Sequence, residues 1–234
     1  MSNRPLIFLG SNVAMAVFGE VCKEIGINVV GIIDKDYYGN TEEIGGIPVI
    51  DSEDAFDDPV MAKEYRDNYD FFCAVNWMPM TDPVTVRNRE KRTRLLNLID
   101  QHDLGCATII DPRAKVSPTA KIGRGVYIDA WCLVDPGVSI GDFTHMWSYA
   151  SVGFGCHVGR NCVIQRSCNM THVTLEDEVY LAPNVSLFKL GAVIGHNTFI
   201  QECIYLRRGT VPNEIISING SNTRRVYTNP ITLE

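Results

Sequence analysis

The sequence predicts two units of different architecture: an α/β unit over residues 1–107 and a parallel β-solenoid over residues 108–211, followed by a C-terminal tail over residues 212–234. Two observations lead to this prediction. In the first half, short apolar runs alternate with segments of helical periodicity. In the second half, aliphatic residues recur at every sixth position, a period that fits neither an α-helix nor a coiled coil.

The apolar runs of the first half have the length of buried strands in a parallel sheet. We expect strands at residues 5–10, 28–34, 47–50 and 71–77, and a linking strand at 106–110. Residues 13–26 and 84–102 carry apolar side chains at helical spacing, and the first of these segments stops at Gly26. The stretch between the third and fourth strands is mixed and acidic. This alternation favours a doubly wound α/β unit.

The second half repeats with a period of six residues. All eleven positions counted in sixes from Ile110 to Met170 are aliphatic or Met, and the positions two places earlier are small or β-branched. Glycine and proline fall between these positions, where the chain must turn. One short strand per hexapeptide and three hexapeptides per coil give roughly six coils of eighteen residues.

Two irregularities interrupt the repeat. The aliphatic row shortens to five residues between Met170 and Leu175, and it lengthens by one residue before Ile194. Both irregularities flank the segment THVTLEDEVYLAPNVSLFKLG, residues 171–191. Because functional sites are where local regularity is usually broken, we expect the site in this segment.

Charge and composition narrow the classes of function. With 21 Lys and Arg against 28 Asp and Glu, the net charge is −7, which is a poor balance for a nucleic-acid binder. No apolar run reaches the roughly 18–20 residues of a membrane span, and the run PLIFL is shorter than the core of a secretory signal. We therefore expect a cytoplasmic protein with no nucleic-acid partner and no membrane partner.

The eight cysteines do not suggest a metal site. None forms a C-x-x-C pair, and Cys156, Cys162 and Cys168 are spaced by six residues like the repeat itself. We expect them to be small buried hydrophobic residues. A metal-dependent hydratase would need three histidines at particular corners, and the gaps between His145, His157 and His172 do not suit one.

Three stretches of the sequence, IFLGSN, VVGIIDKDYYGNTEEIGGIPVI and IIDPRAKVSPTAKIGRGVYI, resemble the nucleotide-sugar N- and O-acyltransferases of the hexapeptide-repeat family. That branch makes bacillosamine, perosamine and sialic-acid derivatives for surface glycans. The resemblance implies a Rossmann-like nucleotide-sugar-binding domain followed by a left-handed parallel β-helix. It also implies N-acetylation of a nucleotide-linked amino sugar by acetyl-CoA, without metal, in a homotrimer whose sites lie at subunit interfaces.

The first strand ends in a turn that lacks the further glycines of a dinucleotide fingerprint. The residues alone leave open whether this turn binds a nucleotide or only begins a helix. In the family that the chain resembles, this turn, the acidic pair after the second strand and the loop after the fourth strand hold the nucleotide. The corresponding residues here are Gly10, Ser11, Asn12, Asp34, Asp36 and Asn76.

Acyl transfer from a thioester to an amine needs a base for the amine proton and a donor for the developing oxyanion. The resemblance places the base at His172, in the first irregularity of the repeat. Relatives commonly carry an acid beside this histidine, whereas the neighbours here are Thr171 and Val173. Glu176 or Asp177 would then orient the imidazole, within the chain or across a subunit interface. Some similar acetyltransferases use no protein base.

One coil after the histidine, the family uses a backbone N–H to hold the thioester oxygen. Leu190 lies eighteen residues after His172, and the extra residue in this coil makes Gly191 the better candidate. Arg207 and Arg208 are candidates for binding the phosphates of coenzyme A, and a solvated basic patch is the alternative. A non-catalytic nucleotide-sugar-binding scaffold and an O-acetyltransferase remain the alternative functions.

Overall fold

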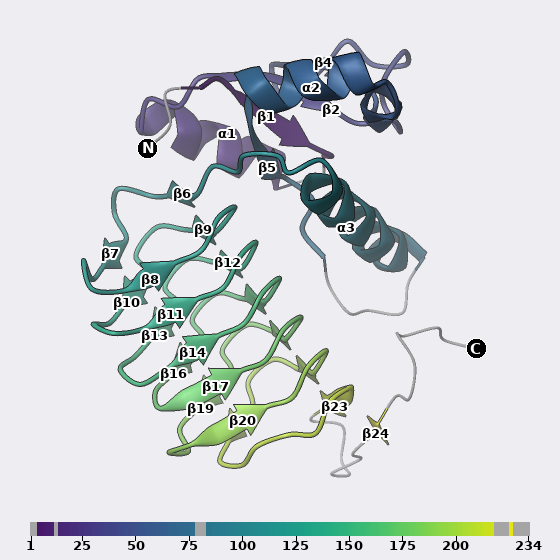
Figure 1. The fold of residues 1–234 in the computed structure, drawn as a ribbon. Coiled ribbons are helices and arrows are strands. Elements are labelled where there is room, and N and C mark those ends of the chain that lie inside the picture. Colours follow the sequence, from purple (N-terminus) through teal and green to yellow (C-terminus); the bar gives the residue numbers. More distant parts are fainter. Residues whose placement is uncertain (1–3, 12–13, 78–82, 218–224, 227–234) are drawn as a thin grey trace. The chain divides into compact units, whose positions relative to one another are not determined.

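The chain is described here by a computed structural model that covers residues 4–11, 14–77, 83–217 and 225–226, without the side chains of residues 83–86 and 225–226. Its internal contacts divide it into two compact units, Met1–Ile109 and Ile110–Glu234 (Figure 1). The division falls two residues after the predicted boundary. None of the helices in these ranges is long and apolar enough to cross a membrane.

The first unit is built on a five-stranded sheet with the order β3-β4-β2-β1-β5. Four strands are parallel, and the short β3 pairs antiparallel with β4. The strand β1 has β2 on one side and β5 on the other, and all its side chains are buried. The strand order reverses here, and open α/β sheets usually bind ligands at the carboxyl ends of the strands at such a point. The strands are β1 (Leu6–Leu9), β2 (Val29–Ile33), β3 (Glu43–Ile44), β4 (Ile47–Asp51) and β5 (Asp70–Cys73).

The helices of this unit are α1 (Met15–Glu24), α2 (Pro59–Asn68) and α3 (Pro83–Gln101), with a 3₁₀ turn η1 (Glu53–Asp57). Sequence reasoning predicts α1 and α3 but not α2 or η1, since it treats the stretch between the third and fourth strands only as mixed and acidic. The signal for α2 is local. Asp58 caps the helix by accepting a hydrogen bond from the Val60 amide, and Pro59 occupies the first turn.

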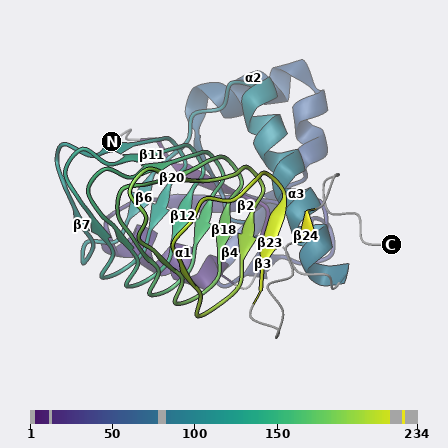
Figure 2. The same cartoon turned by 90° about the horizontal axis from the view of Figure 1, so that it is seen from below.

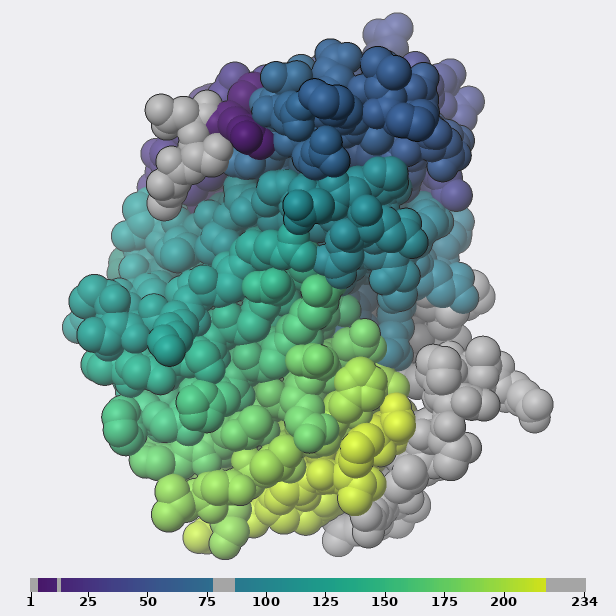
Figure 3. All heavy atoms as spheres, viewed as in Figure 1, coloured from purple at the N-terminus to yellow at the C-terminus, as the bar shows by residue number. Residues whose placement is uncertain are grey.

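The second unit is a parallel β-helix of three sheets, and its coils form successive bands from teal to yellow in Figure 3. Figure 2 looks along the stack, with β6, β12, β18 and β23 in one row. The first sheet contains β7 (Lys115–Val116), β10 (Leu133–Val134), β13 (Ser151–Val152), β16 (Asn169–Met170), β19 (Ser186–Leu187) and β22 (Tyr205–Leu206). The second contains β8 (Lys121–Ile122), β11 (Ser139–Ile140), β14 (His157–Val158), β17 (Val173–Leu175) and β20 (Ala192–Ile194). The third contains β6 (Ile109–Ile110), β9 (Tyr127–Ile128), β12 (His145–Met146), β15 (Val163–Ile164), β18 (Tyr180–Leu181), β21 (Phe199–Ile200), β23 (Glu214–Ile216) and the antiparallel β24 (Arg225–Val226).

The two predicted rows of apolar residues form the interior of the β-helix. Its core contains the aliphatic row from Ile128 to Met170 and the smaller row that includes Cys132, Cys156, Cys162 and Cys168. These four cysteines are free thiols and are buried. The prediction that they serve as small hydrophobic residues is therefore confirmed.

Both irregularities of the repeat are present in the strand register. Asn169 pairs with Ser151, eighteen residues earlier, but Thr174 pairs with His157, seventeen residues earlier. The next coil is longer, since Val193 pairs with Thr174 across nineteen residues. The coil then continues to Ile216, five residues beyond the predicted end at 211. The last coil has only sixteen residues between Phe199 and its partner Ile215, so a count in sixes misses it.

Candidate functional site

The shortened coil brings a set of predicted residues to one corner of the β-helix. We call this the His172 corner: the turns at residues 153–155, 171–172, 188–191 and 207–208, which follow β13, β16, β19 and β22. His172 itself is half-buried and has a left-handed backbone with φ 55°. Its amide donates a hydrogen bond to the Phe154 carbonyl one coil earlier, at 3.0 Å. The corner thus presents an imidazole from a fixed backbone.

Phe154 and Gly155 form the support on which the imidazole lies. The rings of His172 and Phe154 meet edge to face, with centroids 5.6 Å apart and an interplanar angle of 74°. A Cβ on Gly155 would lie 2.9 Å from Cδ2 of His172, closer than any ordinary contact. Gly155 therefore leaves the space that the imidazole occupies.

The polar partner of the imidazole is the preceding residue. The Thr171 hydroxyl lies 3.1 Å from Nδ1 of His172, and the same hydroxyl donates a hydrogen bond to the Phe154 carbonyl at 3.2 Å. Sequence reasoning did not assign Thr171 a role, because it looked for an acid beside the histidine. Only the geometry of the corner identifies it.

The expectation that Glu176 or Asp177 orients His172 within the chain is not met. Three residues of β17 separate them from His172, so they lie across the sheet at the next corner, roughly 10 Å further along an extended strand. There the Glu176 carboxylate accepts a hydrogen bond from the His196 amide at 2.6 Å, and Asp177 accepts one from the Arg160 amide at 2.7 Å. Both acids line an open hollow of about 520 Å³ together with the side chains of His157 and His196. Within one chain they stabilise turns.

Gly191 lies beside His172, as predicted, but its amide already donates a hydrogen bond within the chain. The Gly191 N–H donates to the His172 carbonyl at 2.9 Å, and the glycine has φ 72°. The nineteen-residue spacing of this coil places Gly191 directly next to His172. The Leu190 amide has no hydrogen-bond partner among the described residues, and its side chain is 77% exposed. Of the two predicted amides, Leu190 is therefore the one that can donate to a ligand without breaking a bond.

The two predicted arginines differ in what they contact. Arg208 forms an ion pair with the fully buried Glu214 at 2.7 Å and donates to the Gly209 carbonyl. Hydrogen bonding to Glu214 raises the pKa of Arg208 above its ordinary value. Arg207 is exposed at the same corner, one coil after Leu190. Arg207 is consequently the better candidate for a phosphate.

In the first unit, the loop after β1 contacts the end of β2. Gly10 has φ 69°, and a Cβ there would lie 2.5 Å from Val75 Cγ2, so only glycine fits. The Ser11 hydroxyl donates to Asp34 at 2.6 Å. Gly10, Ser11 and Asp34 are thus brought together as predicted, whereas Asn12 lies outside the described residues.

A buried lysine, which sequence reasoning missed, completes this cluster. Nζ of Lys91, on α3, lies 2.7 Å from Asp34 Oδ1 and 2.7 Å from Asp36 Oδ2. Burial acts against the charge of Lys91, but the two carboxylates raise its pKa overall. The hydrogen bond from Lys91 in turn lowers the pKa of Asp36. The available signal was that Lys91 lies on the apolar stripe of its helix, one turn before the buried Leu95.

The two aspartates of this cluster have different environments. Asp34 is fully buried, and its carboxylate accepts hydrogen bonds from Lys91, from the Ser11 hydroxyl and from the Asp36 amide. The Asp36 carboxylate is 48% exposed. Asp36 is therefore the carboxylate that can accept a hydrogen bond from a ligand. Asn76 follows β5, the strand beside β1, at the same edge of the sheet.

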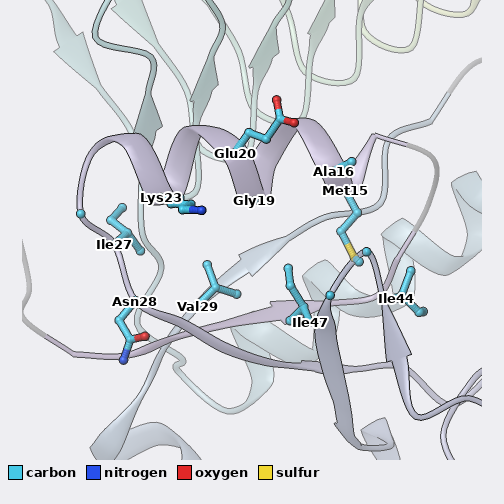
Figure 4. A pocket seen from close by; sticks show the side chains of 13 residues that line it. Met15, Ala16, Gly19, Glu20, Lys23, Ile27, Asn28, Val29, Ile44 and Ile47 are labelled. Atoms are coloured by element: carbon cyan, nitrogen blue, oxygen red, sulfur yellow. The ribbon is translucent and has the colours of Figure 1, made fainter.

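The first unit also has a hollow, which lies away from the cluster around Asp34. It has a volume of about 600 Å³ and lies between α1, the start of β2 and the β3–β4 turn (Figure 4). Its lining is mostly apolar, with Ile27, Val29 and Ile47 on one side and Glu20 and Lys23 on the helix. It borders the amino end of β2, opposite the edge that carries Asp34. Within the described ranges, no group of three or more His, Cys, Asp or Glu side chains could hold a metal ion.

No protein-family model matches the chain. Among solved structures, a GDP-perosamine N-acetyl transferase from Caulobacter crescentus, a mutant in complex with CoA and GDP-perosamine, is 19% identical, with a TM-score of 0.65 over 96% of this chain and 97% of that chain. The acetyltransferase domain of PglB from Neisseria gonorrhoeae is 17% identical, with a TM-score of 0.73 over 96% and 100%. WeeI from Acinetobacter baumannii is 15% identical, with a TM-score of 0.64 over 95% and 99%. The predicted resemblance is confirmed at the level of the fold, since these structures include a GDP-perosamine N-acetyl transferase and an acetyltransferase domain.

Proposed function

We propose that this chain is an acetyl-CoA-dependent N-acetyltransferase that acts on an amino group of a nucleotide-linked amino sugar. The observation that carries the proposal is the His172 corner. There, an accessible imidazole lies in a break of the β-helix, between a glycine that makes room for it and a hydroxyl that contacts it. The similar Caulobacter crescentus structure, which contains CoA and GDP-perosamine, supports the same pair of substrates here.

In this reaction the amine nitrogen attacks the carbonyl carbon of the thioester. The free nitrogen of the His172 imidazole accepts the proton that the amine loses. The carbonyl oxygen gains negative charge, which the Leu190 amide would stabilise by donating a hydrogen bond. The carbon–sulfur bond then breaks, the sulfur leaves as the thiolate of coenzyme A, and it takes up the proton from the imidazolium. Arg207 would bind a phosphate of coenzyme A.

We assign the first unit to the nucleotide, as a Rossmann-like domain. Gly10 allows the chain to turn tightly after β1, and the exposed Asp36 offers a carboxylate to a hydroxyl or N–H donor of the nucleotide. The buried Lys91 holds the Asp36 carboxylate in place through an ion pair. The role of this domain is to fix the remote end of the substrate, so that binding energy is used to orient the amine.

We propose that the chain assembles as a homotrimer of left-handed β-helices, with its active sites at the subunit interfaces. We further propose that it is cytoplasmic and takes part in surface-glycan biosynthesis. Exposed apolar side chains on the β-helix support association, because such side chains on one surface usually mark an interface. They include Phe154, Leu190 and Tyr205, which are 60%, 77% and 59% exposed. Light scattering at micromolar concentration should give three times the chain mass, and a monomer with full activity would argue against the trimer.

A panel of nucleotide sugars tests the proposed activity. Nucleotide-linked amino sugars should raise the melting temperature of the native protein, since they bind only the folded state, and one of them should be acetylated in the presence of acetyl-CoA. The matched hydroxy sugar should show no turnover. Binding without any acetyl transfer would favour a scaffold protein, and transfer to the hydroxy sugar would favour an O-acetyltransferase.

A further inference from the structure

We propose that Thr171 is a positioning residue that fixes which nitrogen of the His172 imidazole carries the proton. This inference rests on the proposed function, because it matters only if His172 acts as a base. It concerns the missing acid beside the histidine. The hydroxyl of Thr171 contacts the ring in this chain, 3.1 Å from Nδ1.

The direction of the hydrogen bonds follows from counting protons. A threonine hydroxyl has one proton to donate and lone pairs with which to accept. That proton is directed to the Phe154 carbonyl, 3.2 Å away. With the proton directed to this carbonyl, the hydroxyl accepts a hydrogen bond from Nδ1 of His172, and we infer that Nδ1 carries the hydrogen. In the neutral imidazole this leaves the lone pair on Nε2, which makes Nε2 the nitrogen that accepts a proton.

The carbonyl that sets this direction is itself fixed. The Phe154 oxygen also accepts the His172 amide at 3.0 Å, so the backbone and the hydroxyl are tied to one acceptor. The branched Thr171 side chain has few rotamers, which helps keep the hydroxyl in place. A Cβ on Gly153 would lie 3.2 Å from the Thr171 hydroxyl oxygen, just as Gly155 leaves room for the imidazole. The glycines of the Gly-Phe-Gly turn thus make space for Thr171 and His172 together.

A hydroxyl acts differently from a carboxylate in this place. It orients the ring and selects the tautomer, but it adds no negative charge to stabilise the imidazolium that forms. The imidazolium can then pass its proton on to the leaving thiolate without losing a charge partner. The loss of the Thr171 hydroxyl should therefore change the tautomer of the imidazole and should raise the barrier to reaction by only about the free energy of one neutral hydrogen bond.

The test uses two variants of the full chain, T171V and T171S. Valine keeps the branched shape and loses the hydroxyl, whereas serine keeps the hydroxyl. Two-bond ¹H–¹⁵N spectra of the histidine rings, with H172Q to assign the signal, report the tautomer without any turnover. We expect Nδ1–H in the native protein and in T171S, and a mixture of tautomers in T171V. In parallel, T171V should lower kcat about three- to tenfold with an unchanged KM for acetyl-CoA, and T171S should restore most of it.

Two results would overturn this inference. One is an Nε2–H tautomer in the native protein, and the other is a T171V spectrum identical to the native one while thermal melting shows an intact fold. Failure of the proposed function looks different. A correct tautomer without acetyl transfer to any amino sugar would leave the role of Thr171 intact and remove the proposed reaction.

Discussion

The imidazole of His172 lies over Gly155, seventeen residues earlier, so closely that a single added methyl group at Gly155 would come 2.9 Å from Cδ2 of His172. Phe143 lies over Gly125 in the same way at the regular spacing of eighteen residues, where an added Cβ would come 2.5 Å from Phe143 Cδ1. The shortened coil keeps this stacking and changes only the spacing, so that His172 lies over the residue seventeen positions earlier.

Replacing Gly155 by alanine should displace the imidazole. The residue has φ 73°, so alanine also strains the backbone by about 1–2 kcal/mol. Gly137 is a matched control at the equivalent turn one coil earlier, with φ 75° and nothing within 4 Å of an added Cβ. Both variants should lose similar stability in urea unfolding, but only G155A should lose kcat. Equal activity in the two variants would contradict the placement of His172.

Replacing Lys91 by methionine should cost far more stability than replacing an exposed lysine. Lys91 is 5% exposed against a fully buried Asp34, and its removal leaves that charge unpaired, at a cost of roughly 3–5 kcal/mol. Lys63, which pairs with Asp67 while 68% exposed, is the control, and K63M should change stability by less than about 0.5 kcal/mol. Adding D34N to K91M should recover part of the loss.

The stability that K91M loses relative to the native protein should depend on pH. The bond from Lys91 lowers the pKa of Asp36, so its contribution to stability is present above the ordinary value near 3.9 and is lost as the pH falls below it. The difference in unfolding free energy between K91M and the native protein should therefore be largest near neutral pH and shrink below about pH 4. Urea unfolding between pH 3 and 7 measures it, and a difference that grows on acidification would be the wrong sign.

Substitution of Arg207 should weaken the binding of acetyl-CoA, whereas substitution of Arg208 should lower the stability of the fold. R207A should raise the KM for acetyl-CoA about three- to tenfold, as expected for one exposed ionic contact, with little change in melting temperature. R208A should instead lower stability by about 1–3 kcal/mol, because it leaves the buried Glu214 without its partner. Reversed effects of the two variants would exclude Arg207 as the phosphate ligand.

The cysteines should differ sharply in reactivity. Burial raises the pKa of the Cys132, Cys162 and Cys168 thiols to about 12, so almost none is a thiolate at pH 8. Cys203 is exposed. A thiol reagent followed by mass spectrometry should label Cys203 first in the native protein and the three core cysteines only after unfolding. Labelling of the core cysteines in C203S at the rate of Cys203 would contradict the packing.

The sequence predicted the fold of the second unit well, because burial of apolar side chains dominates the interior of a β-helix. The interior of a β-helix must be filled at every coil, so the rows through Val152 and Cys156 and the register break after Met170 could be read directly from the period. The family resemblance placed Gly10, Ser11 and Asp34 in one site, and the structure brings these three residues together.

Features that depend on side-chain contacts over long separations could not be predicted. Lys91 meets Asp34 across fifty-seven residues, and its position on the apolar stripe of α3 indicates burial but does not identify its partner. Glu176 is near His172 in sequence, yet the strand between them carries it to another corner, where it binds a backbone amide. The Thr171 hydroxyl meets the carbonyl of Phe154, which lies one coil away and is not its neighbour in sequence.

The central claim is that His172 is the base of acetyl transfer, and steady-state kinetics of H172A test it most directly. Exposed His196, at a different corner, provides the control variant H196A. On the nucleotide-linked amino sugar that the native protein acetylates, H172A should lower kcat by about 10²–10⁴ with little change in the KM for acetyl-CoA and with the fold intact. H196A should keep kcat. A loss below about tenfold in folded H172A would contradict the claim, because the amine would then lose its proton without this imidazole.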